Sequence, residues 1–535
     1  MPKSPHHVSR FPESPWTLIP EARLQDWPQQ AAAEAERVTA NFAHPRDPDC
    51  VKRFLRAAAP RGRWLIHGAG SHTRDLLPLL QQAPDFKPVG IIDRLGDQIE
   101  SRFGMPVFTP RQARDQNADG VLLSHTCREW DMAVTLAEAG FPAERIHALY
   151  RHPDYAAACA PWYADLEQRI PAGIENLIIR CGRSTVIDDA HLARCFNPDT
   201  TLSVFAGRRD YFEPATRFPQ INVAQSLQAV FTIIRRTGAK TIYLSTGWFN
   251  NELALALYQQ FPDRRIIHEI FDWNVLFPSD TTVAAFGHHP GTIQRNLLGE
   301  YVSLQRAAAV VSKRDGPYWA RVVSAGPRPY LAFHAGFLEN TPTHTPRSAD
   351  GTHLIYGGIL PDPEFLANYQ IDYDFLPLFE TLATKPNLSI SLFNSLDDGD
   401  PRFHPYHERF AAGALRYHAR LPYAQFLEHA ARGDYGWQAV IHRKEFAPDQ
   451  ICVLPSRAIG YLAAGLPLIL DSGWHFLAEL VNRFDAGLIL DDFRPDAVLA
   501  RIKGAPHAHH RAGAARLYQW IGQHNEKTLA QLHFA

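Results

Sequence analysis

The chain has 535 residues, of which 45% are hydrophobic and 21% are charged, and its formal net charge at pH 7 is −2. A chain of this length can bury several hydrophobic cores, so we expect more than one domain. The near-neutral charge and the lack of a basic stripe exclude nucleic acid as an expected partner.

The six cysteines are scattered and form no CxxC pair, which argues against a disulfide framework and fits a reducing cytosol. The 26 histidines fall in no HExxH spacing, so we expect no metal site, and we interpret the histidine cluster at 505–513 as a solvated loop. The chain has no apolar signal region and no run of about 18 apolar residues, which predicts a soluble cytoplasmic protein. The sequence is compatible with peripheral contact with a membrane.

Strands and helices alternate along most of the chain. Residues 1–60 read as an N-terminal extension with one helix, and the alternation begins in the unit 61–150. The strands expected in this first unit are 63–67, 88–94, 105–110, 120–125 and 145–149. Such alternation predicts a parallel, doubly wound sheet with right-handed crossovers.

The segment "LIHGAGSHTRDLLPLL", followed by "VGIIDR", resembles the Rossmann-like half-domain of sugar acetyltransferases of the PglD type. The resemblance implies that Gly68, Gly70 and Arg74 surround a phosphate and that Asp93 accepts a hydrogen bond from a ribose hydroxyl. Because "GAGSHT" lacks the third glycine of GxGxxG, it indicates NAD only weakly. An accessory domain without a ligand is the alternative.

The alternation restarts after a connecting helix at 151–170, and it restarts again after a Pro-containing linker at 338–351. The expected strands of the middle unit, 151–337, are 175–181, 200–207, 240–246, 264–272 and 307–313. Those of the third unit, 352–535, are 352–358, 388–394, 415–422, 436–442, 466–471 and 486–492. We therefore predict an α/β protein of three consecutive doubly wound, Rossmann-like units.

Four segments of the third unit occur in the order typical of one enzyme family: "LPYAQFLEHA", "GWQAVIH", "LPSRAIGYLAAGLPLIL" and "HFLAELVNRFDAGLIL". Together with "HLIYGGIL" before them, they resemble the donor-binding half of retaining glycosyltransferases with the GT-B architecture, of the family 4 and family 1 kind. The resemblance covers 352–495 well and 175–335 more faintly. It implies that the last two units form a GT-B pair, with the acceptor on the middle unit and the donor on the third.

The resemblance also implies a site for a UDP- or GDP-linked sugar that requires no metal or other cofactor. Backbone N–H groups at a glycine turn or a helix N-terminus can hold a diphosphate. The implied donor-binding residues are Gly357, Gly358, His442, Arg443, Lys444, Ser456, Arg457, Tyr461 and Gly465. The family carries a ribose-binding glutamate at the position of Gly460, and its usual Arg and Lys after the first glycine turn are also missing here. Either nearby basic residues replace them or catalysis has been lost.

Glu269 and Asp272 lie in "HEIFDWN", at the expected end of a strand of the middle unit. They are the candidate catalytic carboxylates, either for acceptor recognition or for a position close to the anomeric carbon. A helix cap or a loop salt bridge is the structural alternative for both residues. No general base can be assigned from the sequence.

The sequence thus predicts a glycosyltransferase that moves a sugar from a nucleotide donor to a glycan, lipid-linked or protein acceptor. Two alternatives stay open. The missing glutamate favours a catalytically silent nucleotide-sugar-binding or scaffold protein, and the 60–150 segment would suit an NAD-dependent oxidoreductase.

Overall fold

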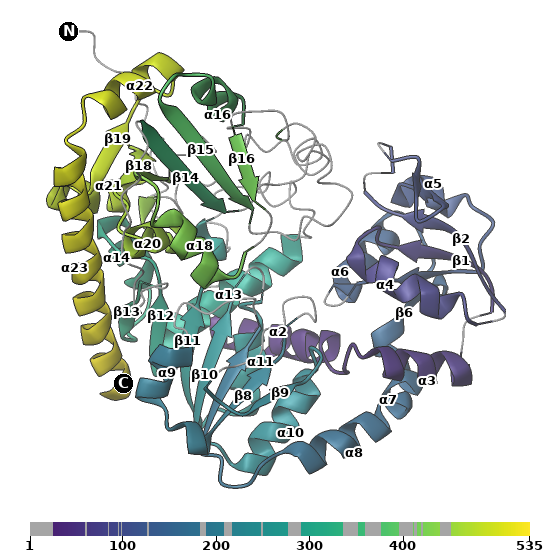
Figure 1. Cartoon of the computed structure of the whole chain (residues 1–535). Helices are drawn as coiled ribbons and strands as arrows, with labels where there is room; N and C mark the ends of the chain where they lie inside the picture. The colour runs from purple at the N-terminus through teal and green to yellow at the C-terminus, as the bar shows by residue number, and fades with distance from the viewer. Residues whose placement is uncertain are drawn as a thin grey trace.

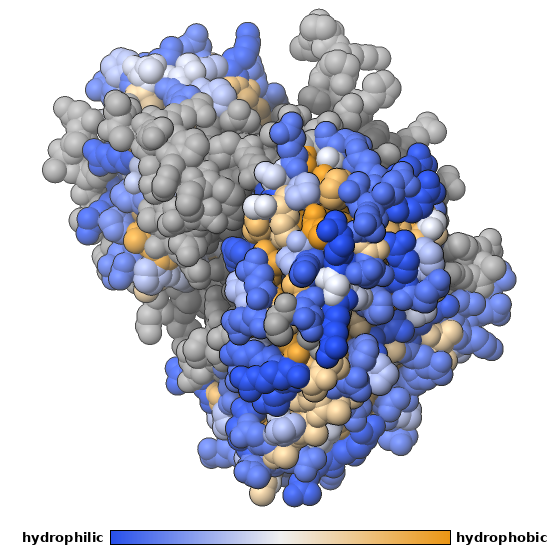
Figure 2. Space-filling model, turned by 90° about the vertical axis from the view of Figure 1, so that its right-hand side faces the viewer, coloured by the Kyte–Doolittle hydropathy of each residue, from blue (hydrophilic) through white to orange (hydrophobic). Residues whose placement is uncertain are grey.

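The computed structural model describes residues 25–58, 61–83, 85–94, 96–97, 99–125, 128–181, 189–207, 217–247, 250–276, 290–334, 351–358, 376–394, 410, 415–418, 421–438 and 451–534. Three sheets, each flanked by helices, succeed one another along the chain, and the middle unit lies between the other two (Figure 1). On the side of the first unit, hydrophilic residues make up much of the described surface, with hydrophobic residues interspersed (Figure 2).

The first sheet has the strand order β3-β4-β2-β1-β5-β6, in which β3 alone runs antiparallel, to β4. Its strands are β1 (Gly62–His67), β2 (Phe86–Ile92), β3 (Ser101–Arg102), β4 (Met105–Phe108), β5 (Gly120–Leu123) and β6 (Ile146–Ala148). The helices of this unit are α3 (Pro48–Ala58), α4 (Ser71–Leu80), α5 (Pro110–Arg114), α6 (Glu129–Glu138) and α7 (Pro153–Ala158), and α8 (Ala160–Arg169) leads out of it. The order of the parallel strands reverses between β1 and β5, as in a doubly wound sheet.

The middle sheet is parallel throughout and has the order β13-β12-β11-β10-β7-β8-β9. Its strands are β7 (Asn176–Arg180), β8 (Thr201–Phe205), β9 (Gln220–Asn222), β10 (Thr241–Thr246), β11 (Arg265–Ile270), β12 (Ala309–Ser312) and β13 (Tyr330–Ala332). Its helices are α2 (Trp27–Asn41), α9 (Asp189–Cys195), α10 (Leu227–Thr237), α11 (Leu253–Gln260), α13 (Pro290–Arg306) and α14 (Pro317–Val323). Helix α2 comes from the N-terminal part of the chain and packs against α11 and α13.

The third sheet is also parallel and has the order β16-β15-β14-β17-β18-β19, so its strand order reverses between β14 and β17. Its strands are β14 (Thr352–Gly358), β15 (Leu388–Asn394), β16 (Leu415–His418), β17 (Tyr435–Trp437), β18 (Leu468–Asp471) and β19 (Gly487–Leu490). Its helices are α16 (Leu376–Ala383), α18 (Tyr423–Ala430), α20 (Ser456–Ala463), α21 (His475–Phe484) and α22 (Pro495–Lys503).

One long helix, α23 (His507–Phe534), belongs to two units (Figure 1). Near its start, the His507 ring lies 2.8 Å from the carbonyl oxygen of Asp434 in the third unit. Near its end, Leu529 and Leu532 join the core of the middle sheet. The expectation of a solvated loop at 505–513 is therefore wrong for 507–513, because these residues form the first turns of this helix.

The strands form where the sequence is continuously hydrophobic, which is typical of parallel sheets covered by helices on both faces. All four residues of β5, of β12 and of β18 are buried. The prediction of three doubly wound α/β units is confirmed, since each sheet shows the reversed strand order of that fold. No helix in the described ranges is long and apolar enough to cross a membrane.

Candidate functional site

The third sheet brings several predicted donor-binding residues to one place. In an open α/β sheet, ligands bind at the carboxyl ends of the strands where the strand order reverses. Here that point lies between β14, which ends at Gly357 and Gly358, and β17. Helix α20 begins at Ser456 and packs on β17 and β18.

Arg457 connects the first turn of α20 with the end of β14. Its guanidinium group lies so close to Gly358 that a Cβ atom on that residue would overlap it. The same group lies over the ring of Tyr356, 4.8 Å from the ring centroid, which adds a cation–π attraction. A glycine at 358 is therefore what lets this cation reach the carboxyl end of the central strand.

Tyr461 is fully buried beneath this position, and its hydroxyl contacts the backbone. Its hydroxyl oxygen accepts a hydrogen bond of 2.8 Å from the backbone N–H of Gly357, and its hydroxyl lies 3.3 Å from the carbonyl oxygen of Trp437. Its ring takes the space where a side chain on Gly436 would be. Burial raises the pKa of this phenol above its usual value, so it stays neutral. Tyr461 thus ties the ends of β14 and β17 to α20.

Gly460, where the resembled family has a glutamate, is buried inside α20. A Cβ atom at this position would lie 2.9 Å from the hydroxyl oxygen of Tyr423. Tyr423 begins α18, and 46% of its surface is exposed. The structure therefore places a tyrosine hydroxyl beside the position of the missing carboxylate.

Gly465 lies at the other end of α20, away from the strand ends. Its φ of +74° is a left-handed conformation that glycine adopts without strain, and its N–H donates to the carbonyl oxygen of Leu462 over 3.0 Å. It turns the chain from the helix into β18, so its place in the fold is that of a helix terminator. His442, Arg443 and Lys444 lie outside the described residues.

The two candidate catalytic carboxylates occupy different environments. Glu269 is within β11, is fully buried and interacts with Tyr243 on the neighbouring strand. Asp272 follows the end of β11, and its Oδ1 atom lies 3.8 Å from Lys313 Nζ and 3.6 Å from an Arg314 Nη. Of the two, Asp272 is the one at the carboxyl edge of the middle sheet.

A buried hydrogen-bond network close to Asp272 was not anticipated from the sequence. The carboxylate of Glu300 accepts bonds of 2.6 Å from Asn251, 2.6 and 2.7 Å from Asn274 and 3.1 Å from the N–H of Val275. Asn251 also donates to the backbone carbonyl of Asp272 over 3.0 Å. The network holds the loop after β11, and the only sequence signal for it is a run of polar residues after β10.

In the first unit, contacts within the protein hold the predicted phosphate-binding loop in place. Gly68 has a φ of +116°, and a Cβ atom there would lie 2.8 Å from the carbonyl oxygen of Ser124. Asp93 accepts a hydrogen bond of 3.0 Å from the N–H of Ala69, so one of its carboxylate oxygens stabilises the loop itself.

The other two predicted residues, Gly70 and Arg74, lie at the start of α4 and within it. A Cβ atom on Gly70 would have no neighbour within 4 Å, and Gly70 directly precedes α4. Arg74 is exposed and lies 3.0 Å from the carboxylate of its neighbour Asp75. The structure therefore brings Gly68, Gly70 and Asp93 together at the adjacent carboxyl ends of β1 and β2 and leaves Arg74 on the helix surface.

Comparisons with known proteins give distant likenesses. No protein-family model matches the chain, and no curated protein matches it either. Among solved structures, ligand-free OtsA is 9% identical with a TM-score of 0.45, over 67% of this chain and 98% of that one. HepE of Anabaena, in complex with UDP, is 11% identical with a TM-score of 0.46, over 68% and 100%. WaaG, a glycosyltransferase involved in lipopolysaccharide biosynthesis, is 10% identical with a TM-score of 0.40, over 67% and 99%.

Proposed function

We propose that the protein is a cytoplasmic glycosyltransferase, with its last two units acting as a GT-B pair. It would transfer a hexose-type sugar from a UDP- or GDP-linked donor, held by the third unit, to a glycan, lipid-linked or protein acceptor on the middle unit. The observation that carries this proposal is the position of Arg457, whose guanidinium group lies against Gly358 at the point where the third sheet reverses its strand order.

The chemistry of a nucleotide sugar suits this position. The bond between the sugar and the diphosphate breaks as negative charge grows on the leaving phosphate, and fixed positive charges lower the energy of that state. Arg457 supplies one such charge. The N-terminal end of α20, which begins at Ser456, supplies backbone N–H groups and the positive end of the helix dipole. We propose transfer with retention and without a metal in the transfer step, as the sequence resemblance implies.

Asp272 is the residue we propose for contact with the acceptor. It lies at the carboxyl edge of the middle sheet, within 3.8 Å of Lys313 and 3.6 Å of Arg314. Glu269 is enclosed in the sheet, so we assign it a structural role.

A second candidate function is a nucleotide-sugar-binding protein without transferase activity. It is favoured by Gly460, since α20 offers no carboxylate for the ribose hydroxyls at that position. In the transferase, the hydroxyl of Tyr423 beside Gly460 would take over that hydrogen bond.

Titration calorimetry with UDP, GDP and NADH, followed by hydrolysis and transfer assays with a panel of UDP- and GDP-sugars, distinguishes these functions. We expect one nucleotide diphosphate to bind, its sugar to be released or transferred, and Arg457→Ala to weaken binding about tenfold or more. Arg483→Ala, which removes an exposed arginine on α21, is the matched control and should bind normally. Binding without turnover supports the second function. The proposal fails if no nucleotide sugar binds, or if NADH alone binds.

A further inference from the structure

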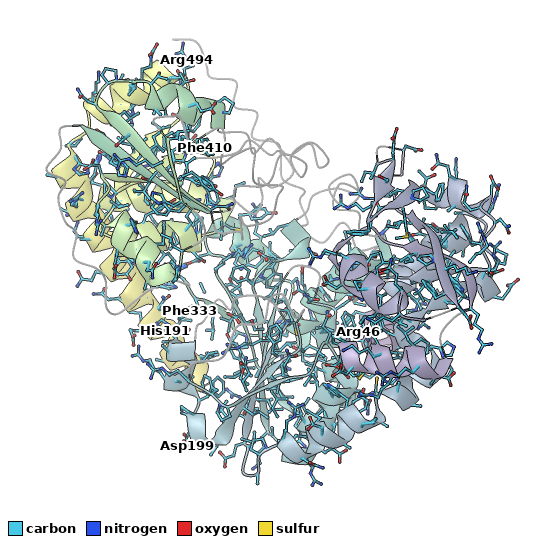
Figure 3. All side chains as sticks on the ribbon, turned by 45° about the vertical axis from the view of Figure 1, so that its right-hand side comes forward. Arg46, His191, Asp199, Phe333, Phe410 and Arg494 are labelled. Carbon is cyan, nitrogen blue, oxygen red and sulfur yellow. The ribbon has the colours of Figure 1, made fainter. Side chains whose placement is uncertain are left out.

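Three side chains from distant parts of the chain meet where α23 reaches the middle sheet. Asp315 follows β12, His334 follows β13, and His524 comes from α23. One ligand atom of each residue lies within 4.8 Å of the corresponding atoms of the other two. Figure 3 shows the neighbouring Phe333 beside His191 at this junction, where their ring centroids are 5.3 Å apart.

His334 is the central member of this group. It is fully buried, and neither of its ring nitrogens has a hydrogen-bond partner among the described residues. The ring is enclosed by Phe476, Trp520 and His524, whose ring centroids lie 6.0, 6.0 and 4.6 Å away. A buried polar group without a partner destabilises a fold, so this imidazole has room for a ligand that none of the described residues supplies.

A backbone carbonyl orients the His524 ring. Its Nε2 atom lies 3.1 Å from the carbonyl oxygen of Ala332, which can only accept, so Nε2 carries the proton and Nδ1 keeps its lone pair. A carbonyl bonded to the second ring nitrogen is the usual orienting contact of a metal-binding histidine.

The surrounding backbone is held in place by further hydrogen bonds. The Asn525 side chain accepts from the N–H of His334 over 2.9 Å and donates to its carbonyl oxygen over 2.8 Å. Thr528 donates to the carbonyl oxygen of Ala332 over 2.7 Å. One carboxylate oxygen of Asp315 accepts from the N–H of Gly316 over 2.7 Å, which orients the other. The group is therefore pre-organised on rigid elements.

We propose that Asp315, His334 and His524 bind a divalent transition metal of the zinc class. Two imidazoles and a carboxylate are typical zinc ligands at about 2.0–2.2 Å, and tetrahedral geometry then places ligand atoms roughly 3.4 Å apart. The ligand atoms, which now lie within 4.8 Å of one another, would have to draw together by about an ångström when the metal binds. A fourth position is left for water.

The metal would connect three parts of the fold. Asp315 also donates its backbone N–H to the carbonyl oxygen of Cys452 over 2.7 Å, and Arg314 pairs with Val453 in an isolated antiparallel bridge. The segment 451–455 leads directly into α20. A metal on Asp315 would thus stabilise the contact between the middle unit, α23 and the start of the proposed donor site, without entering the transfer reaction.

The test uses the full chain without a histidine tag. Chelator-treated protein is titrated with Co²⁺, and its visible absorption is followed, while zinc content is measured by mass spectrometry after equilibration with Zn²⁺ and desalting. We expect one tight equivalent, d–d bands typical of four-coordinate Co²⁺, and a higher melting temperature with Zn²⁺.

His524→Gln and Asp315→Asn are the variants, because each keeps the hydrogen bond that its side chain makes and loses a good metal ligand. Both should lower Co²⁺ affinity at least tenfold to a hundredfold while keeping the circular dichroism spectrum of the wild type. His509→Gln, at an exposed position on the same helix, should bind normally. The proposal is overturned if the folded wild type takes up no tight equivalent, or if the variants bind the metal as well as the wild type does.

Discussion

A buried ion pair between the first and middle units leads to the most quantitative prediction. Arg295, on α13, is 6% exposed; its Nε atom lies 2.7 Å from Glu252, and one Nη atom lies 3.0 and 3.1 Å from the two carboxylate oxygens of Asp131. Asp131 belongs to α6 of the first unit, whereas Glu252 belongs to the middle unit. Arg295→Met keeps much of the side-chain volume but removes the cation that contacts Glu252 and the nearer cation of Asp131, whose other partner Arg128 lies 4.0 Å away.

The expected loss in unfolding free energy is about 3–5 kcal/mol, the usual cost of removing one partner from a buried pair. The loss should depend on pH. Burial raises the pKa of Glu252 from 4.5 to about 7 even with Arg295 present, and the pKa rises further without the arginine. A carboxyl group whose folded-state pKa is raised stabilises the fold below its unfolded-state pKa and loses that contribution as pH rises through the folded value. The unfolding free energy that Arg295→Met loses relative to the wild type should therefore be larger at pH 8 than at pH 5.5.

Urea unfolding followed by tryptophan fluorescence, at both pH values, measures the first transition of wild type and variant. Arg306→Met, at an exposed position of the same helix, is the matched control and should change the free energy by less than about 0.5 kcal/mol. If Arg295→Met behaves like this control, or if its deficit does not grow with pH, the assignment of a buried, desolvated pair is wrong.

Three further predictions concern residues in or beside the strands. Gly358→Ala should displace the Arg457 guanidinium and weaken nucleotide diphosphate binding on the order of tenfold in titration calorimetry, with an unchanged circular dichroism spectrum. Tyr461→Phe should lower the unfolding free energy in urea by about 1–3 kcal/mol, because the buried N–H of Gly357 loses its acceptor. His268, whose pKa burial lowers from 6.5 to about 3, contributes stability that is present above pH 6.5 and lost as pH falls. The unfolding free energy of His268→Gln should therefore fall less steeply than that of the wild type as the pH is lowered, with slopes that differ by up to about 1.4 kcal/mol per pH unit. Equal slopes would contradict this prediction.

The central strands were predictable because their residues are buried on both faces and therefore form unbroken hydrophobic runs. β10 and β18 were found within a residue or two of their ends in this way. The edge strands β9 and β13, of three residues each, were missed, since a short strand with one neighbour shows neither a long run nor a clear alternation. The helical start of α23 was missed because its histidines suggested a solvated loop.

The candidate site was predictable only in part. The resemblance pointed to Gly358 and Arg457, and the structure brings these two into contact. It also included Tyr461 among the donor-binding residues, whereas the hydroxyl of that side chain holds the backbone of Gly357. Sequence reasoning fails for such roles because the contacts join residues 104 positions apart. The same holds for the pair Asp131–Arg295, which is 164 positions apart and matches no motif.

The length of α23 is constrained by its two docking ends. His507 contacts the third unit, and Asn525 and Thr528 bond to the strand end of the middle unit, within one helix of 28 residues. Each residue of an α-helix advances it by about 1.5 Å and turns it by about 100°, so the whole element spans roughly 42 Å. Adding or deleting one residue between these ends would swing the later contacts away from the sheet. The two docking ends therefore fix the number of residues between them, whereas a substitution at an exposed position of the helix leaves both contacts in place.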